Sequence, residues 1–116
     1  MRIYKDFSFE SAHRLPLVPE NHQCFNLHGH SFNARITISG ELLPQGWVMD
    51  FGEVKKICSP IINILDHSYL NEIEGLENPT SENIAIWLWE KISKDLQGLY
   101  SIEVKETCNS GCLYFG

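Results

Sequence analysis

The chain has 116 residues, with 43% hydrophobic and 21% charged residues, values typical of a globular domain. Its formal net charge of −6 argues against nucleic acid and anionic membranes as main partners. No apolar run is long enough to cross a bilayer and no export leader pattern opens the chain. We therefore expect one cytoplasmic domain over residues 1–116, with its four cysteines reduced.

Two N-terminal segments show the alternation of half-buried strands. The first spans residues 2–13, and the second runs from His28 to about Gly40. In each segment the residues of one parity are mainly apolar and those of the other are mainly polar, which predicts a buried and an open face. Residues 15–27 contain two prolines and two asparagines, so they are expected to form a loop.

A helix is expected after the second strand. Asp50 and Glu53 have the spacing of a capping box, and apolar residues then recur at helical spacing as far as Leu65. Pro60 lies inside this segment and should kink or interrupt the helix, because it removes a backbone donor.

The C-terminal half predicts a second helix and two further strands. A loop over 66–79 is followed by a helix over about 81–97, with one apolar stripe. Two short strands are expected near 100–107 and 111–115, joined by a turn.

The resulting order, ββααββ, predicts an α+β fold with one antiparallel four-stranded sheet and both helices on one face. The uncovered face is expected to be polar and to carry Lys5, Arg35, Thr37, Glu103 and Lys105. Such a sheet has two open edges, and closure of several subunits into a β-barrel would remove them, which makes a homo-oligomer an expectation.

Three histidines fall on the predicted inward faces of the two N-terminal strands. His28 and His30 share the apolar face of the second strand, and His13 shares that of the first. If the strands pair as a hairpin, these imidazoles converge and form a ligand set for Zn²⁺ with an open fourth position. The alternative is that each histidine is a hydrogen-bonded core residue. His22, in the polar loop, is predicted to be exposed.

Cys24 and the Asp66-His67 pair are candidates for acid–base chemistry. Cys24 is a small apolar residue, a fourth ligand that closes the metal site, or a thiolate that acts beside the metal. Asp66 can orient the imidazole of His67 during proton transfer, or the pair is an ordinary helix terminus. The pattern leaves these alternatives open.

Glu106 is predicted to point inward from its strand. A buried carboxylate needs a protein cation or a ligand, and two parallel N–H donors of a guanidine-like heterocycle edge would suit it. Cys108 and Cys112 have a spacing that is loose for zinc, so we interpret them as ordinary thiols.

Five segments together resemble one enzyme family over essentially the whole chain. FESAHRLP, C-x-x-x-HGHSF, LDHSYLN, ENPTSEN and VKETC occur in the order found in the 6-pyruvoyltetrahydropterin synthase / 6-carboxytetrahydropterin synthase family. The short C-x-x-x-HGH spacing and the ETC sequence are most similar to the bacterial 6-carboxytetrahydropterin synthase branch of queuosine biosynthesis.

The resemblance implies roles for individual residues. It implies zinc ligands at His13, His28 and His30, catalysis by Cys24, Asp66 and His67, and pterin binding by Glu106. It also implies a tunnelling fold, in which trimers close into a barrel and often pair as hexamers, with the Asp-His pair supplied by a neighbouring chain.

The reaction implied by the resemblance converts a pterin triphosphate. The substrate would be 7,8-dihydroneopterin triphosphate and the products 6-carboxy-5,6,7,8-tetrahydropterin, acetaldehyde and triphosphate. Two alternatives are the 6-pyruvoyl product, formed without carbon–carbon cleavage, and a non-catalytic zinc or pterin module. Arg14, next to a predicted metal ligand, is a candidate for contact with the triphosphate.

Overall fold

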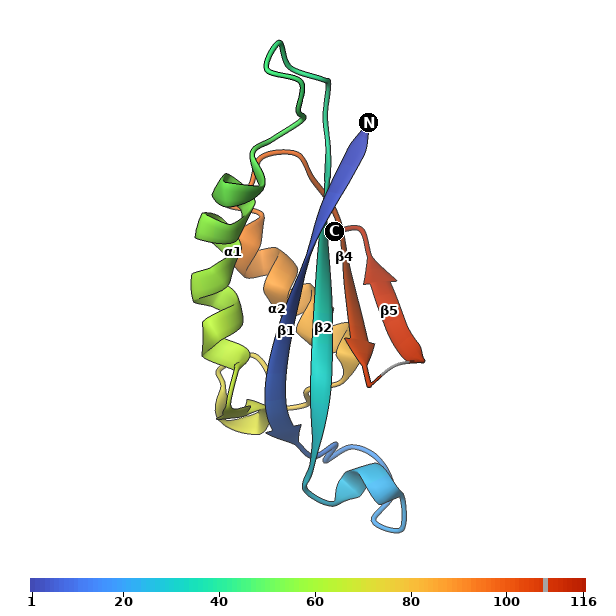
Figure 1. Cartoon of the computed structure of the whole chain (residues 1–116). Coiled ribbons are helices and arrows are strands. Elements are labelled where there is room, and N and C mark those ends of the chain that lie inside the picture. The colour runs from blue at the N-terminus through green and yellow to red at the C-terminus, as the bar shows by residue number, and fades with distance from the viewer. Residues whose placement is uncertain (108) are drawn as a thin grey trace.

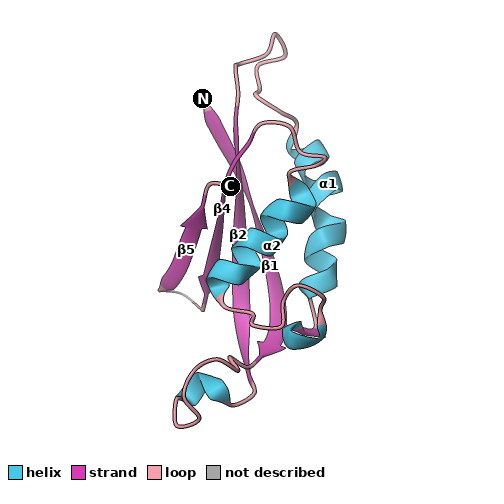
Figure 2. Ribbon diagram, turned by 180° about the vertical axis from the view of Figure 1, so that it is seen from behind, coloured by secondary structure: helices cyan, strands magenta, loops and turns pink. Residues whose placement is uncertain are grey.

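The computed structural model describes residues 1–107 and 109–116 as one mixed sheet with helices on one face (Figure 1). The strands are β1 (Arg2–His13), β2 (His28–Ser39), β3 (Ser68–Tyr69), β4 (Leu99–Glu106) and β5 (Ser110–Tyr114), in the spatial order β3-β1-β2-β4-β5. The helices are α1 (Phe51–Leu65) and α2 (Ser81–Ile92), with short 3₁₀ turns η1 (Gln23–Phe25) and η2 (Leu70–Glu72). Seen from behind, α1 and α2 cover the same face of the sheet (Figure 2).

The α+β class and the placement of both helices on one face are confirmed, but the predicted number of strands is wrong. The described residues form a five-stranded sheet, because β3 adds a short parallel strand beside Ser11 and Ala12 of β1. The backbone N–H of His67 donates to the carbonyl of Glu10 over 2.6 Å and starts this pairing. Two residues are too few to produce a periodic pattern, so the sequence carried no signal for β3.

The long β1–β2 hairpin sets the position of the site. Phe9 pairs with Phe32 and His13 pairs with His28, so the end of β1 meets the start of β2. Cross-strand partners in an antiparallel pair project to the same face. The face that carries these residues packs on the helices and forms the core, which includes Phe9, Phe32, Ile36, Ile38, Val54, Leu65, Ile84, Leu88, Ile102 and Val104.

Both helices differ in detail from expectation. Helix α1 runs through Pro60 without interruption; Pro60 and Lys56, one turn earlier, are both exposed, so the carbonyl that loses its donor faces solvent. Helix α2 ends at Ile92 instead of near residue 97, although Leu96 remains buried. The chain reverses at Gly98, whose φ of +82° favours glycine.

The uncovered face of the sheet is polar, as predicted. Arg35 donates to Asp6 over 2.8 Å and stacks 3.8 Å from the ring centroid of Tyr4. Lys5 was predicted on this face but lies on the other, because it pairs with the buried Ile36 and shares its orientation. The sheet remains open at β3 and β5 within the described chain.

Two further sequence-based expectations concern membranes and thiols. Within residues 1–107 and 109–116, no helix is both long enough and apolar enough to cross a bilayer. Cys58 is buried, and burial raises the pKa of its thiol to about 11. Cys112 is half-buried and its pKa is also raised by burial, whereas Cys108 lies outside the described residues.

Candidate metal centre and active site

The three histidine rings meet where β1 ends and β2 begins. The ring centroids of His13 and His28 lie 4.5 Å apart, those of His28 and His30 4.8 Å, and those of His13 and His30 5.1 Å. One ring nitrogen from each histidine lies within 4.8 Å of the other two. Bonds of about 2.1 Å to one zinc ion require a shorter spacing, so metal binding needs side-chain rotations that bring these nitrogens together.

In two of the histidines, a backbone carbonyl binds the Nδ1 atom and leaves the Nε2 atom free. Nδ1 of His13 lies 2.8 Å from the carbonyl of Pro79, and Nδ1 of His28 lies 2.7 Å from the carbonyl of Asn26. A carbonyl only accepts, so each Nδ1 carries the proton and each Nε2 keeps a lone pair. Backbone carbonyls of this kind orient metal-binding histidines in many proteins.

The free nitrogens are buried and lack partners. Nε2 of His13 and Nε2 of His28 have no hydrogen-bond partner within the described part of the chain. Burial lowers the pKa of His13, so its ring stays neutral near pH 7. Orphaned buried nitrogens cost free energy unless a ligand satisfies them, and a metal ion fits both atoms. The residues present therefore fit a bound metal.

The group of possible ligands contains the three histidines alone. Among the described residues, neither Cys24 nor Glu106 belongs to it. Three ligands leave a fourth tetrahedral position for water or substrate, which is the arrangement of catalytic rather than structural zinc sites. The geometry does not favour the alternative in which Cys24 closes the site.

A pocket of about 530 Å³ opens beside the histidines. Its walls include Cys24, His28, His30, Glu106 and Thr107. The pocket therefore gathers residues from η1, β2 and the end of β4, which are far apart in the sequence. A thiol and a carboxylate thus lie around the candidate metal centre.

Glu106 points inward, as its strand parity predicted. It pairs with the buried Phe32, and its side chain is 27% exposed. The Ser81 hydroxyl donates to Oε1 over 2.7 Å, while Oε2 lies 3.8 Å from Nε2 of His30. Within the described chain, no lysine or arginine forms an ion pair with it, so the carboxylate keeps acceptor capacity for a ligand.

Thr107 is a residue at this site that the sequence analysis did not single out. Continued strand alternation after Glu106 would turn its side chain away from the pocket, but Oγ1 of Thr107 lies 3.0 Å from Nδ1 of His30. Thr107 follows the end of β4 with φ of 48°, so the alternation of the strand no longer applies to it. No local pattern signals a positive φ at a threonine.

Asp66 and His67 form a hydrogen-bonded pair at the end of α1. Oδ2 of Asp66 lies 2.9 Å from Nδ1 of His67, whose side chain is 80% exposed. Two hydrogen bonds hold the pKa of Asp66 below its ordinary value. The larger effect comes from the backbone N–H of Glu10 and the smaller from the side chain of His67. His67 has φ of 55°, a strained conformation that occurs preferentially at functional sites.

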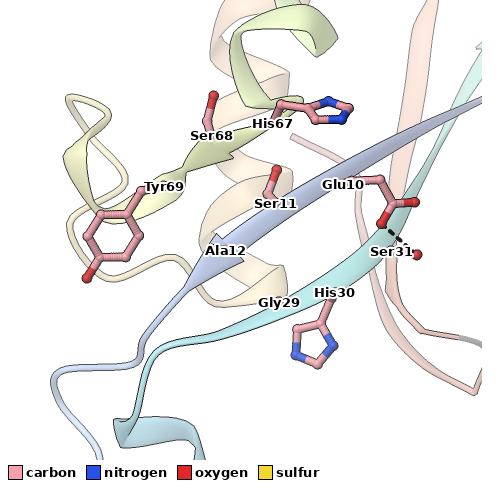
Figure 3. A pocket seen from close by; sticks show the side chains of 9 residues that line it. All are labelled: Glu10, Ser11, Ala12, Gly29, His30, Ser31, His67, Ser68 and Tyr69. Carbon is pink, nitrogen blue, oxygen red and sulfur yellow. Dashed lines mark hydrogen bonds between the residues drawn. The ribbon is translucent and has the colours of Figure 1, made fainter.

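The Asp66-His67 pair does not share the pocket that contains Cys24. His67 lines a second pocket, of about 560 Å³, with Glu10 and Tyr69, and the two pockets have only Gly29 and His30 in common. Figure 3 shows the His67 and His30 rings on opposite sides of the β1–β2 pair, pointing away from each other. One chain therefore does not bring His67 to Cys24.

The loop that carries Cys24 has its own contacts. His22 is exposed, as predicted, but its Nδ1 accepts a hydrogen bond from the backbone N–H of Cys24 over 3.1 Å. Arg14 contacts this loop, because its Nε donates to the carbonyl of Phe25 over 3.2 Å.

Fold and site together define an α+β protein with a candidate three-histidine metal centre beside a pocket. The sequence model of the family "6-pyruvoyl tetrahydropterin synthase" matches residues 2–116, so the chain belongs to this family. Its fold is the tunnelling fold of that family.

Relatives and solved structures agree with this assignment. A 6-carboxy-5,6,7,8-tetrahydropterin synthase of Synechocystis is 47% identical over 97% of this chain and 92% of its own length. A dihydroneopterin monophosphate aldolase of Pyrococcus furiosus is 40% identical over 84% of this chain and 79% of its own. The 6-pyruvoyl tetrahydropterin synthase of Caenorhabditis elegans superposes with a TM-score of 0.91 at 29% identity, covering 100% of this chain and 95% of that one.

Proposed function

We propose that the protein is a zinc-dependent 6-carboxytetrahydropterin synthase of queuosine (7-deazaguanine) biosynthesis. It converts 7,8-dihydroneopterin triphosphate, with uptake of water, to 6-carboxy-5,6,7,8-tetrahydropterin, acetaldehyde and triphosphate. The observation that carries the proposal is the pocket that places Cys24 and Glu106 beside His28 and His30, together with the unpartnered Nε2 atoms of His13 and His28. The relative of that name, 47% identical over 97% of this chain, supports the choice of product.

Glu106 anchors the pterin in this proposal. The guanidine-like edge of the ring presents two parallel N–H donors, which a carboxylate accepts in a bidentate manner. The hydrogen bond from Ser81 fixes the orientation of the carboxylate. The ring would then lie with its side chain towards His28 and His30, which line the same pocket.

His13, His28 and His30 would hold the zinc ion. A bound zinc ion supplies Lewis-acid polarisation of the hydroxyl and carbonyl oxygens of the substrate side chain. Cys24, as thiolate, removes a proton from the side chain and returns it. His67 is the acid–base counterpart of Cys24, and Asp66 keeps the proton of that ring on Nδ1, which leaves Nε2 free to exchange protons.

Because His67 and Cys24 line different pockets, the proposal requires more than one chain. We propose a homotrimer, or a dimer of trimers, in which the open sheets close into a β-barrel and each Asp66-His67 pair serves a neighbour's Cys24. The exposed position of His67 and the open sheet edges support this assembly. A cytoplasmic location, expected from the sequence, stays a prediction.

Product identification tests the proposal. The purified protein, with its metal content measured, is incubated with 7,8-dihydroneopterin triphosphate, and acetaldehyde and the pterin product are identified. We expect acetaldehyde and 6-carboxytetrahydropterin in equal amounts, with loss of both after chelation and recovery on addition of Zn²⁺. Activity that survives complete removal of metal would contradict the metal-dependent mechanism.

Two competing reactions are separated by the same assay. A 6-pyruvoyl product without acetaldehyde would assign the protein to triphosphate elimination, the reaction that the family name denotes. Because one relative is a dihydroneopterin monophosphate aldolase, a parallel incubation uses dihydroneopterin monophosphate as the substrate. Cleavage of the monophosphate, with no turnover of the triphosphate, would replace the proposed function by an aldolase reaction.

A further inference from the structure

Cys24 lies on a part of the chain that extends away from the sheet. The turn η1, which carries Cys24, belongs to the connection between β1 and β2 and lies beyond the end of both strands (Figure 1). The hydrogen bond from the backbone N–H of Cys24 to the side chain of His22 caps η1. It joins neighbouring residues of the same turn and does not attach η1 to the rest of the domain. Other contacts must therefore set the position of the thiol.

Arg14 and Leu15 supply these contacts from the end of β1. Nε of Arg14 donates to the carbonyl of Phe25 over 3.2 Å, and its guanidinium carbon lies 4.6 Å from the centroid of the Phe25 ring. The backbone N–H of Leu15 donates to the carbonyl of Cys24 over 2.8 Å. Leu15 thus holds Cys24, and Arg14 holds Phe25 through both a hydrogen bond and a cation–π contact.

Arg14 is itself fixed by a segment distant in sequence. The side chain of Asn71, in η2, accepts from the Arg14 N–H over 3.0 Å and donates to the Arg14 carbonyl over 2.8 Å. Nδ2 of Asn71 also donates to the carbonyl of Glu77 over 3.3 Å. These bonds connect Arg14 to the loop that follows α1, so Arg14 joins η1 to the folded body.

We propose that Arg14 is a positioning residue that sets the position of Cys24 in the pocket beside His28 and His30. The catalytic use of that thiol rests on the proposed function. Arg14 was also a candidate for binding triphosphate, but the residue is half-buried and its guanidinium is already engaged with Phe25. It therefore acts on the chemical step through Cys24, and not on the affinity for the phosphate groups of the substrate.

Arg14→Lys in the full-length protein tests this role, because lysine keeps the charge but lacks the planar fork that bonds and stacks at once. Arg2→Lys is the matched control: Arg2 also stacks on an aromatic ring, 3.7 Å from the centroid of Tyr100, at a site that does not contact η1. We expect Arg14→Lys to lower kcat by about tenfold or more with KM changed less than about threefold, and Arg2→Lys to change neither.

A second readout does not depend on activity. The rate of Cys24 alkylation by iodoacetamide, followed by peptide mass spectrometry on metal-free protein, reports how firmly η1 is held. We expect a rate increase of about fivefold or more in Arg14→Lys and no change in Arg2→Lys, with Cys112 as an internal reference in each protein. If the wild type does not release acetaldehyde, the proposed function fails, while this readout still decides the role of Arg14.

Two results would overturn the proposal. One is an unchanged alkylation rate in Arg14→Lys. The other is a KM increase for the triphosphate that is absent with unphosphorylated 7,8-dihydroneopterin, which would make Arg14 a phosphate ligand. Should Arg14→Lys fail to fold, Asn71→Asp replaces it, since aspartate keeps the acceptor for the Arg14 N–H and loses the donor to the Arg14 carbonyl. The same increase in Cys24 alkylation is then expected, and its absence counts against the proposal.

Discussion

The hydroxyl oxygen of Thr107 lies 3.0 Å from Nδ1 of His30, and Thr107 reaches this position with a φ of 48°. A β-branched residue rarely adopts this left-handed conformation, which costs about 1–3 kcal/mol. The hydroxyl can accept from Nδ1–H, as the carbonyls of Pro79 and Asn26 do for the other two histidines. The strain is thus concentrated at a residue that orients one of the candidate metal ligands.

Replacement of Thr107 by valine tests this orientation. Valine has the same shape but no acceptor, so His30 loses the group that holds its tautomer, and we expect zinc affinity to fall about 10–100-fold. Competition with a chromophoric chelator measures the affinity. Thr107→Ser keeps the hydroxyl and is expected to stay within about threefold of the wild type. Equal affinities for the valine and serine variants would show that the hydroxyl has no such role.

Cys24→Ala separates a catalytic thiol from a metal ligand. Because Cys24 lies in the pocket but outside the group of possible ligands, we expect full zinc occupancy and a loss of kcat of at least about 100-fold. Metal analysis and turnover are measured on the same preparation. As a control, His13→Ala should lose the metal and the activity together. Loss of zinc from Cys24→Ala would instead indicate that Cys24 is the fourth ligand of a closed structural site.

Mixed oligomers test whether His67 serves a neighbouring chain. Cys24→Ala and His67→Ala are each expected to be inactive alone. In mixtures assembled from equal amounts of the two variants, about a quarter of the sites combine an intact Cys24 with an intact neighbouring His67, so about a quarter of the wild-type activity should return. Subunits mixed without dissociation and reassembly provide the control. A site formed within one chain predicts no recovery.

The ion pair between Asp6 and Arg35 predicts a dependence of stability on pH. The hydrogen bond from Arg35 holds the pKa of Asp6 below its ordinary value, so the pair stabilises the fold above about pH 3.9 and loses this contribution as pH falls through the lowered pKa. Both side chains are more than a third exposed, which limits the contribution to below about 1 kcal/mol.

Asp6→Asn is therefore expected to lower the free energy of urea unfolding by about 0.5 kcal/mol at neutral pH, with the difference shrinking in acid. Asp95→Asn is the matched control, since Asp95 is exposed and forms no ion pair among the described residues. A destabilisation by Asp6→Asn that is the same at neutral and acidic pH would argue against the ion pair as its cause.

Two glycines with positive φ should respond differently to alanine. A Cβ at Gly98 would lie 2.9 Å from the carbonyl oxygen of Ser39, whereas one at Gly46 meets nothing within 4 Å. Both substitutions carry the strain of a left-handed alanine, about 1 kcal/mol, but only Gly98→Ala adds a clash with backbone. We expect losses of unfolding free energy of about 1 kcal/mol at Gly46 and about 2–4 kcal/mol at Gly98. Equal losses would mean that the Ser39 backbone yields without cost.

The local pattern of the sequence predicted both helices and the four longer strands, but not β3, and it predicted the inward residues of β1 and β2. The alternation in β1 and β2 predicted that His13, His28 and His30 project inward, and the structure brings their rings together. The capping box and the helical spacing predicted α1 from Asp50 to Leu65, although not its continuity through Pro60, because side-chain periodicity follows directly from backbone geometry. The roles of these residues in metal binding and catalysis stay predictions.

The local sequence pattern did not predict contacts between segments that are far apart along the chain. The acceptors behind the imidazoles, such as Pro79 for His13, lie far along the chain, and so does Asn71, which holds Arg14. The separate pockets of His67 and Cys24, and the turned side chain of Thr107, depend on where strands end and on positive φ values. Periodicity encodes which way a side chain points relative to its own backbone, but the folded chain alone sets which remote atom it meets.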